Sequence, residues 1–322
     1  MSLDPDAREL VLTVRHKSEI TDGVFLFVLQ SLTGAELPAF TPGSHITVTA
    51  PSGQKRRYSL CNDCNERYRY VIAVKREPSG RGGSLSFTTD VREGDQIIVE
   101  PPANEFEMSA SEPKSFIFIA GGIGITPIRA MILHCVRHGK QNFKLYYFTR
   151  TPSMMAFRDE FSAPEFAGKV ILHHDNGDAG QAYDLWPVLE EQRGAQLYCC
   201  GPRGLMDAVR DMTGHWSDSA VHFEDFVGAS APHADDKPFE VKLARSGKSY
   251  EVAVGVSILD TLRKSGHVRA SSCESGTCGT CRTRFTDGEP DHRDLVLSDR
   301  EKKNEIMICV SRSKSSTLTL DI

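Results

Sequence analysis

The chain has 322 residues, of which 39% are hydrophobic and 25% charged, and a net charge of −5. These values are typical of an ordinary globular protein with two or three domains, and they give no sign of the basic surface that nucleic-acid-binding proteins use. The N-terminal stretch MSLDPDAREL lacks the apolar core of a secretory signal. No apolar run approaches the ~20 residues of a transmembrane helix, so we expect a cytoplasmic protein without nucleic-acid or membrane partners.

The first hundred residues alternate apolar and polar side chains in short segments, which are interrupted by Gly, Pro and Asn. Such segments are typical of strands joined by turns. We expect strands at 10–20, 23–30, 45–50, 56–62, 69–77 and 95–102. Several short strands with turn residues between them predict an antiparallel barrel or sandwich.

From about Ser115 the pattern changes to strands that alternate with helical stretches. The run SFIFIA at 115–120 is continuously apolar, as in a strand that is covered on both faces. A glycine turn and a helical stretch at 126–140 follow it. Further strands are expected at 143–150, 169–175 and 196–202, separated by stretches at 155–161 and 183–192 and followed by one at 205–214. This alternation predicts a parallel sheet built from βαβ units.

The small, polar stretch VGASAPHADDKP at 227–238 is typical of an interdomain linker. Behind it, alternating strands at 239–254 and a helix at 257–266 lead into a cysteine-rich segment. We therefore divide the chain into domains at 1–103, 104–228 and 239–322, with a linker at 229–238.

The cysteine-rich segment has the spacing Cys273-x4-Cys278-x2-Cys281, and 27 residues separate Cys281 from the fourth cysteine, Cys309. An x4, x2 spacing followed by a distant fourth cysteine is that of plant-type ferredoxins, in which four thiolates hold a 2Fe–2S cluster. A structural zinc site is the alternative, but zinc ligands usually come as close pairs. Because a cytoplasmic protein keeps its thiols reduced, we expect all four cysteines to ligate a 2Fe–2S cluster.

The stretch IAGGIGITP at 119–127 joins the buried strand to the following helix. Its glycines allow a tight turn close to a ligand, and helix N-termini attract phosphate. We expect Thr126 to cap the helix and Pro127 to lie in its first turn. Pro127 stands where the usual G-x-G-x-x-G pattern has its third glycine, so a plain glycine turn remains the alternative. A second strand ends at Cys200-Gly201-Pro202, the position at which open α/β sheets bind ligands.

The stretch RRYSL at 56–60, followed by GGIGITP and CCGP in that order, resembles the ferredoxin–NADP reductase superfamily. With the C-terminal ferredoxin pattern, the whole chain resembles the phthalate dioxygenase reductase family, which includes vanillate demethylase reductases. The stretches RYVIAVKR, GRGGSLSF, SSCESGTCG and DHRDLVL extend the resemblance over nearly the full length.

The resemblance implies an antiparallel Greek-key flavin barrel, a parallel α/β nucleotide domain and a β-grasp ferredoxin domain. It implies the cofactors FMN, a 2Fe–2S cluster and NADH. NADH would pass a hydride to FMN, and single electrons would then travel through the cluster to a Rieske-type oxygenase, an aromatic-ring dioxygenase or demethylase of the phthalate type. No side chain would need to act as a general acid or base. We expect the reductase to be a monomer.

The resemblance also assigns residues. Those implied to hold FMN are Arg56, Arg57, Tyr58, Ser59, Ala73, Val74, Lys75, Gly82, Gly83, Ser84 and Phe226. Those implied to hold NADH are Gly122, Gly124, Thr126, Arg150, Cys200, Gly201 and Pro202. The three nearest the chemistry are Ser59 at the flavin N5, Cys200 beside the nicotinamide, and Phe226 over one flavin face.

Two positions depart from the family pattern. Arg57 stands where a small hydroxyl residue is expected, and it could add a phosphate contact. Thr151 stands where an acidic residue would reject NADPH, which leaves a strict preference for NADH open.

Two other functions use the same motifs. The chain could be a diaphorase or oxidase that reduces small acceptors or O₂, or a redox sensor in which the cluster is structural. A domain dedicated to the cluster argues against diaphorase or oxidase activity as the main role of the chain. Cys61 and Cys64 form a C-x2-C pair that no nearby histidine completes, so we interpret them as incidental thiols. His134 and His138 lie four residues apart, on what we interpret as a solvated helix face.

Overall fold

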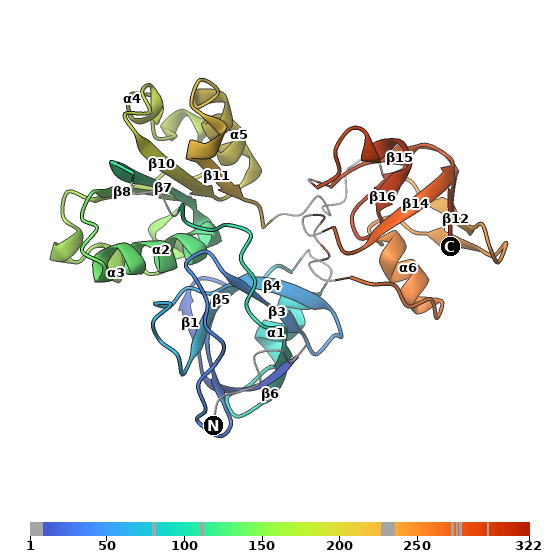
Figure 1. The fold of residues 1–322 in the computed structure, drawn as a ribbon. Coiled ribbons are helices and arrows are strands. Elements are labelled where there is room, and N and C mark those ends of the chain that lie inside the picture. Colours follow the sequence, from blue (N-terminus) through green and yellow to red (C-terminus); the bar gives the residue numbers. More distant parts are fainter. Residues whose placement is uncertain are drawn as a thin grey trace. The chain divides into compact units, whose positions relative to one another are not determined.

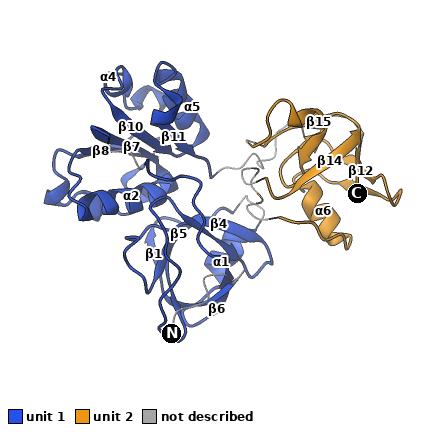
Figure 2. Cartoon of the chain, in the orientation of Figure 1, with its two compact units in different colours: residues 1–226 blue, residues 227–322 orange. Residues whose placement is uncertain are grey.

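The computed structural model describes residues 9–78, 82–109, 113–226, 236–271, 274, 276, 279–294 and 296–322. The chain separates into two compact units, residues 1–226 and residues 227–322, which are coloured separately in Figure 2. We call them unit 1 and unit 2. Unit 1 contains the first two domains expected from the sequence, and unit 2 contains the third.

The first part of unit 1 is an antiparallel six-stranded sheet with the order β4-β3-β6-β1-β2-β5 (Figure 1). A bridge between Leu60 and Ile72 joins the two outer strands, so that the sheet closes into a barrel. The expected Greek-key barrel and all six of its expected strands are confirmed. The strands are β1 (Leu10–Thr21), β2 (Val24–Ser31), β3 (His45–Thr49), β4 (Lys55–Ser59), β5 (Tyr70–Lys75) and β6 (Gln96–Val99).

Alternate side chains of these strands fill the barrel, because successive residues of a strand point to opposite faces. Leu12, Phe27, Ile46 and Ile72 are among the completely buried residues of this core. A helix that we had not expected, α1 (Gly83–Asp90), packs against β4 and contributes the buried Phe87 to the same core.

The second part of unit 1 is the expected parallel sheet, with the order β11-β10-β7-β8-β9. Its strands are β7 (Ser115–Gly121), β8 (Phe143–Thr149), β9 (Val170–His174), β10 (Ala195–Cys200) and β11 (Val221–Glu224). Its helices are α2 (Ile125–Arg137), α3 (Arg158–Phe161), α4 (Trp186–Leu189) and α5 (Arg203–Met212). Short 3-10 turns lie at Gly122–Gly124, Pro152–Met154, Pro164–Phe166, Ala179–Gln181 and Asp218–Ala220.

Helices cover both faces of this sheet (Figure 1). Phe118 and Tyr147 pack with α2 and α3 on one face, whereas Ile119 and Leu197 pack with α4 and α5 on the other. This arrangement explains why the residues after Ser115 in SFIFIA are all apolar, since a strand that is covered on both faces is buried or half-buried along its length.

Unit 2 has a five-stranded mixed sheet with the order β13-β12-β18-β14-β16, in which β12 and β18 are parallel. Helix α6 (Ile258–Lys264) packs on it through Ile258, Leu259 and Leu262, which confirms the β-grasp prediction. The strands are β12 (Phe239–Leu243), β13 (Ser249–Val252), β14 (Arg282–Asp287), β16 (Glu305–Met307) and β18 (Thr317–Leu320). A small sheet of β15 (Pro290–Asp291) and β17 (Arg312–Ser313) and a 3-10 turn at Glu301–Lys303 complete it. In the part of the chain that the structure describes, no helix is long and apolar enough to cross a membrane.

Candidate functional site

The two glycine motifs of the parallel sheet lie against each other. β7 ends at Gly121 and β10 ends at Cys200, and the two strands are hydrogen-bonded neighbours. A Cβ atom on Gly124 would lie 2.1 Å from the backbone oxygen of Cys200, and one on Gly121 would lie 2.5 Å from Cδ of Pro202. Only glycine fits at such close approaches. The loops at 121–124 and 200–202 therefore form one continuous surface at the carboxyl edge of the sheet, where open α/β sheets bind ligands.

The start of α2 differs from our expectation. The 3-10 turn Gly122–Gly124 runs directly into α2, whose N-cap is Gly124 and not Thr126. Thr126 is buried in the first turn, and its hydroxyl donates to the backbone oxygen of Ile123 at 3.0 Å. Pro127 lies in the first turn, as expected. The helix begins before Thr126 because the glycines allow the chain to turn without a side-chain cap.

A carboxyl group connects the barrel with the parallel sheet. Ser59, at the end of β4, donates from Oγ to Oε2 of Glu224, at the end of β11, over 3.4 Å. Glu224 also pairs with Cys200 in the register of β10 and β11. Ser59 and Cys200, both predicted to be near the chemistry, are thus brought to the same carboxyl group. Phe226, the third such residue, follows two positions after Glu224 and is 37% exposed.

A role for Glu224 was not predicted from the sequence, because only Phe226 of the stretch HFEDF was assigned one. A carboxylate at the end of a strand, directly before a predicted flavin contact, was the available signal. Desolvation raises the pKa of Glu224 to about 8, while the nearby Arg57 and the bond from Ser59 oppose the rise and Glu105 adds to it. The carboxyl group is therefore mainly protonated at neutral pH. Burial raises the pKa of Cys200 well above its usual range, so this thiol is also neutral.

Strand β4 sends its side chains in two directions. Tyr58 packs beside Phe87 of α1, with ring centroids 5.7 Å apart. Arg56 lies on the same side, so close that a Cβ on Gly83 would come within 2.8 Å of its Nε atom. The hydroxyl of Tyr58 is buried and has no hydrogen-bond partner among the described residues. A buried hydroxyl without a partner costs free energy, so this atom fits a site that a phosphate-bearing cofactor completes.

The first turn of α1 adds backbone donors beside Arg56. Gly82 precedes the helix with a φ of 87°, which favours glycine, and Gly83 and Ser84 open it. Unpaired N–H groups at a helix start attract phosphate. Ala73 and Val74 are buried on β5, while Lys75 at its end lies 3.4 Å from Glu77. The segment 82–84 therefore supplies the anion-binding part, and β4 with β5 supplies the apolar wall.

Arg57 points away from α1. Its Nε donates to Nε2 of His45 at 2.7 Å, and its Nη2 lies 2.6 Å from Oε1 of Glu105. The phosphate contact considered for Arg57 stays a prediction, because the structure holds no phosphate. What the structure does show is a guanidinium on the Ser59 side of β4, whose positive charge acts on Glu224.

The outer end of the sheet edge carries the residues considered for the adenosine end of the nucleotide. Arg150 is exposed after β8, and its backbone oxygen accepts from the amide of Asn176 at 2.8 Å. Thr151 Oγ1 lies 3.1 Å from Ser153 Oγ. A carboxylate, that of Asp175, also lies at this end of the sheet edge, directly after β9. Its Oδ1 accepts a hydrogen bond from the amide of Gly177.

Cys64 has a histidine neighbour that the sequence did not predict. Its Sγ lies 3.8 Å from Nδ1 of His134 on α2, and the ring of His138 lies 4.1 Å from that of His134. A histidine therefore does lie near the C-x2-C pair, although it does not complete a metal site with it. No third ligand completes a metal site there among the residues described, and desolvation raises the pKa of Cys64. Cys64 and His134 therefore form a neutral contact between the barrel and α2.

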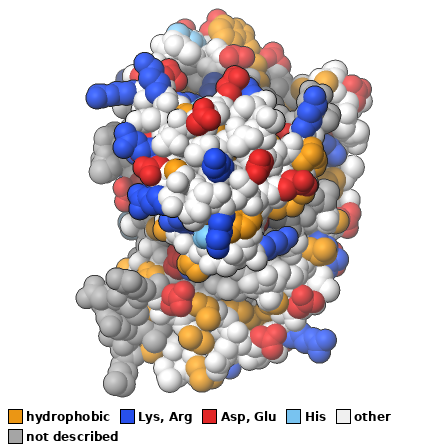
Figure 3. Space-filling model, turned by 90° about the vertical axis from the view of Figure 1, so that its right-hand side faces the viewer, with side chains coloured by type: hydrophobic (Ala, Val, Ile, Leu, Met, Phe, Trp, Pro, Cys, Tyr) orange, Lys and Arg blue, Asp and Glu red, His pale blue; other side chains and the backbone are white. Residues whose placement is uncertain are grey.

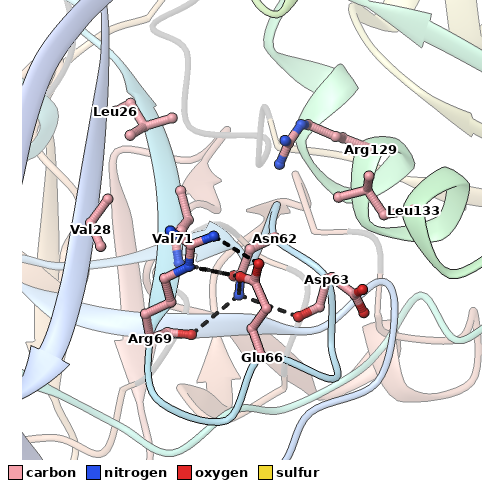
Figure 4. A pocket seen from close by; sticks show the side chains of 9 residues that line it. All are labelled: Leu26, Val28, Asn62, Asp63, Glu66, Arg69, Val71, Arg129 and Leu133. Atoms are coloured by element: carbon pink, nitrogen blue, oxygen red, sulfur yellow. Dashed lines mark hydrogen bonds and ion pairs between the residues drawn. The ribbon is translucent and has the colours of Figure 1, made fainter. Parts of the chain in front are cut away.

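A cavity of about 190 Å³ also lies between the barrel and α2, lined by Leu26, Val28, Asn62, Asp63, Glu66, Arg69, Val71, Arg129 and Leu133 (Figure 4). Glu66 accepts from Asn62 at 2.9 Å and from Arg69 at 2.7 and 2.8 Å. Arg129 donates to Glu160 and to the backbone of Cys61. None of the predicted cofactor residues lines it, so this cavity is not the flavin site.

In unit 2, two of the four predicted cluster ligands are described. Cys281 is 4% exposed and Cys309 is 1% exposed. Cys273 and Cys278 lie outside the described residues. Gly276, between them in the sequence, has a φ of +81°, and a Cβ there would lie 2.7 Å from Val310. Gly276 therefore packs directly against Val310, the residue that follows Cys309, which fits a ligand set drawn from two segments.

The face shown in Figure 3 carries Lys and Arg side chains interspersed with Asp and Glu, without a large area of one sign. This matches the sequence of residues 239–322, in which basic and acidic residues are nearly equal in number. Electrostatic attraction of a partner protein to unit 2 would therefore act only over short distances, between individual charged groups.

Two family models match the chain. The model of the oxidoreductase NAD-binding domain matches residues 118–211, and that of the 2Fe-2S iron-sulfur cluster binding domain matches residues 241–314. The first match lies within the parallel-sheet part of unit 1, and the second lies within unit 2.

Complete proteins match over nearly the whole length. The chain is 51% identical to the phthalate 4,5-dioxygenase oxygenase reductase subunit of Pseudomonas putida, covering 97% of this chain and 96% of that one. It is 50% identical to phthalate dioxygenase reductase of Burkholderia cepacia, covering 97% of both. A solved structure of a phthalate dioxygenase reductase, described as transferring electrons from pyridine nucleotides to [2Fe-2S], superposes with a TM-score of 0.87 at 49% identity and covers 98% of each chain.

Proposed function

Because the chain belongs to the phthalate dioxygenase reductase family, we propose that it is the reductase component of an oxygenase system for aromatic compounds. It is an NAD(P)H-dependent flavin and iron–sulfur oxidoreductase that carries electrons from a pyridine nucleotide to a 2Fe–2S cluster. The observation that carries this proposal is full-length similarity combined with one chain that contains a flavin-type barrel, a nucleotide sheet and a ferredoxin domain.

FMN is proposed to bind on β4, β5 and the start of α1. Arg56 and the amides of Gly82, Gly83 and Ser84 would hold its phosphate, and the Tyr58 hydroxyl would gain the partner that it lacks. When bound, FMN supplies the chemistry that turns the two electrons of a hydride into single-electron transfers. The 2Fe–2S cluster is proposed to bind Cys273, Cys278, Cys281 and Cys309.

NADH is proposed to lie along the carboxyl edge of the parallel sheet. Gly122 and Gly124 leave room for its pyrophosphate beside the start of α2, where backbone amides favour anions. Cys200, Gly201 and Pro202 would orient the nicotinamide toward the flavin. Correct orientation of two reactants removes much of the barrier to their reaction. Phe226, exposed after β11, would cover the flavin and exclude water from it.

The chain's own contribution near the reacting atoms would come from Ser59 and Glu224. The Ser59 hydroxyl is within hydrogen-bonding reach of a carboxyl that holds a proton at neutral pH. A neutral carboxyl beside the flavin would avoid repelling the negative charge that accumulates on reduction, and it could pass a proton to or from Ser59 Oγ. This proposal gives Glu224 a role that the sequence alone did not suggest.

The electron acceptor is proposed to be a Rieske-type dioxygenase or demethylase. We favour one of the phthalate type, because the relatives at 50–51% identity are reductases of phthalate dioxygenases. The reductase is proposed to act as a monomer in the cytoplasm, where its cysteines stay reduced. The described cysteines of unit 1, which are Cys61, Cys64, Cys135, Cys199 and Cys200, form no disulfide in the structure.

Oxygenase-coupled turnover tests this function against the alternatives. The purified reductase is mixed with NADH, a purified phthalate-type oxygenase and phthalate, and both NADH oxidation and hydroxylated product are followed. We expect product formation and NADH oxidation that depend on the oxygenase. Equal NADH oxidation with and without the oxygenase, and no product, would favour a diaphorase. Failure of NADH to reduce any group in the protein would favour a sensor.

A further inference from the structure

Glu274 is an unusual residue to find inside a cluster-binding loop. It follows Cys273 directly, its side chain is only 1% exposed, and its φ of 50° lies in the left-handed region. Left-handed backbone is uncommon for a residue other than glycine. A buried carboxylate is also costly unless it is paired. Both features require that surrounding groups hold this residue in place.

Arg263, in the last turn of α6, is the group that pairs with it. Its Nη2 lies 2.6 Å from Oε1 of Glu274 and donates to Oγ of Ser271 at 3.1 Å. Ser271 Oγ also donates to Glu274 at 3.2 Å. The guanidinium thus contacts the loop on both sides of Cys273.

The position of Arg263 is itself fixed by α6. Its Nη1 donates to Oδ1 of Asp260 at 3.2 Å, and Asp260 is held by Ser257, which caps the helix. The same helix contacts the other half of the cluster site, because the amide of Leu259 donates to the backbone oxygen of Ile308 at 2.9 Å. Ile308 directly precedes Cys309. Helix α6 therefore touches both the three-cysteine loop and the segment that carries the fourth cysteine.

We propose that Arg263 and Glu274 are positioning residues for the 2Fe–2S cluster. Their ion pair holds Glu274, the residue after Cys273, on helix α6, which also contacts the residue before Cys309, and Arg263 balances the buried negative charge of Glu274. This inference rests on the proposed cluster site and adds the residues that organise it. Neither residue ligates iron. Their effect is on how long the cluster is retained and on how easily it accepts an electron.

The test compares Arg263→Gln, Glu274→Gln and the double variant with Lys264→Gln. Lys264 is the next residue of α6, is exposed, and loses the same charge without touching the loop in any contact recorded for the described chain. Cluster loss is timed by visible absorption in the presence of a chelator. The reduction potential is measured by titration with EPR detection, and the fold is monitored by circular dichroism.

Arg263→Gln removes the positive charge that lies against the Glu274 carboxylate, so we expect cluster loss to be at least tenfold faster and the cluster harder to reduce. Glu274→Gln removes the negative charge, so we expect the cluster to become easier to reduce by up to tenfold in the equilibrium constant, which corresponds to about 59 mV for one electron. The double variant removes both charges of the Arg263–Glu274 ion pair and should retain the cluster longer than Arg263→Gln. Lys264→Gln should resemble the unsubstituted protein in both properties.

Opposite shifts of the potential are the result that a merely structural role would not produce. Equal potentials in both single variants and in Lys264→Gln, or a double variant no better than Arg263→Gln, would overturn the inference. If Arg263→Gln does not fold, Arg263→Lys, which keeps the charge, is expected to retain the potential, and Glu274→Gln still tests its shift. An unsubstituted protein without a cluster EPR signal would contradict the proposed cluster site itself, which is a separate failure.

Discussion

Glu224 is the residue whose chemistry depends most on its surroundings. Its carboxyl group accepts from Ser59, pairs along the sheet with Cys200 and lies close enough to Arg57 to be influenced by its charge. Desolvation dominates, and the pKa rises to about 8. Two like charges about 5 Å apart repel by about 3 kcal/mol at an effective dielectric constant of about 20. An ionised Glu224 would therefore oppose the accumulation of negative charge on a neighbouring flavin.

The pH dependence of flavin reduction tests this role. The carboxyl is neutral below its pKa and charged above it, so we expect the rate constant for reduction by NADH to fall at least tenfold as the pH rises through about 8. Glu224→Gln should give a nearly constant rate over the same range, because its amide does not ionise. Anaerobic stopped-flow absorption at the flavin band measures both.

A second variant checks the electrostatic cause. Glu105 raises the pKa of Glu224, so Glu105→Gln should move the midpoint of the pH profile to lower pH. A Glu224→Gln protein that keeps the original profile would show that another group controls the rate.

At the scale of elements, the short strands were the easiest to predict. The alternation of apolar residues identified all six barrel strands, and the continuous run at 115–120 identified the doubly covered β7. Helix α1 was not predicted, because Gly82, Gly83 and Ser84 are typical of a loop and only Leu85 and Phe87 are large apolar residues. The start of α2 was displaced for a similar reason: its glycines take part in the turn that opens the helix.

Contacts between distant elements could not be predicted from local pattern. Ser59 and Glu224 are 165 residues apart in sequence, and Cys64 and His134 are 70 apart. Each pair meets only because the barrel packs against the parallel sheet. The sequence identified Ser59 and Cys200 by their motifs, whereas the carboxyl group between them required the three-dimensional arrangement of β4, β10 and β11.

The start of α1 gives a prediction at this scale. A methyl group on Gly83 would meet the Arg56 side chain at 2.8 Å and displace it. Because a long side chain can move, we expect Gly83→Ala to fold but to bind FMN about tenfold more weakly. Gly204→Ala is the control, since nothing lies within 4 Å of its added Cβ. Fluorescence titration of the deflavinated proteins with FMN compares them, and equal affinities would argue against the proposed phosphate site.

The contact between the loops that follow β7 and β10 gives a second prediction at the scale of elements. A methyl group on Gly124 would lie 2.1 Å from a backbone oxygen of Cys200, which cannot move as a side chain can. Overpacking of this kind costs about 1–3 kcal/mol. We expect Gly124→Ala to lower the melting temperature and to reduce kcat/KM for NADH at least tenfold. An unchanged KM and melting temperature would show that these two loops do not form one nucleotide surface.

At the scale of the whole molecule, the residues proposed to bind flavin and nucleotide belong to unit 1, and the cysteines proposed to hold the cluster belong to unit 2. The two functions should therefore separate on mutation. We expect Cys309→Ser to lose the 2Fe–2S cluster and oxygenase-coupled turnover, while NADH still reduces the flavin at nearly the original rate. Cys64→Ser in unit 1 is the matched control and should retain both activities. A Cys309→Ser protein that supports normal oxygenase turnover would contradict the proposed electron path.

The most direct test of this electron path is an anaerobic titration of the purified protein with NADH, followed by visible absorption and EPR. We expect the flavin absorbance to bleach and a rhombic signal of a reduced 2Fe–2S cluster to develop with it. A parallel titration with NADPH measures the nucleotide preference that Thr151 leaves open. Protein that stays colourless after reconstitution with iron, sulfide and FMN, or that bleaches its flavin without any cluster signal, would contradict electron transfer from NADH through the flavin to a 2Fe–2S cluster.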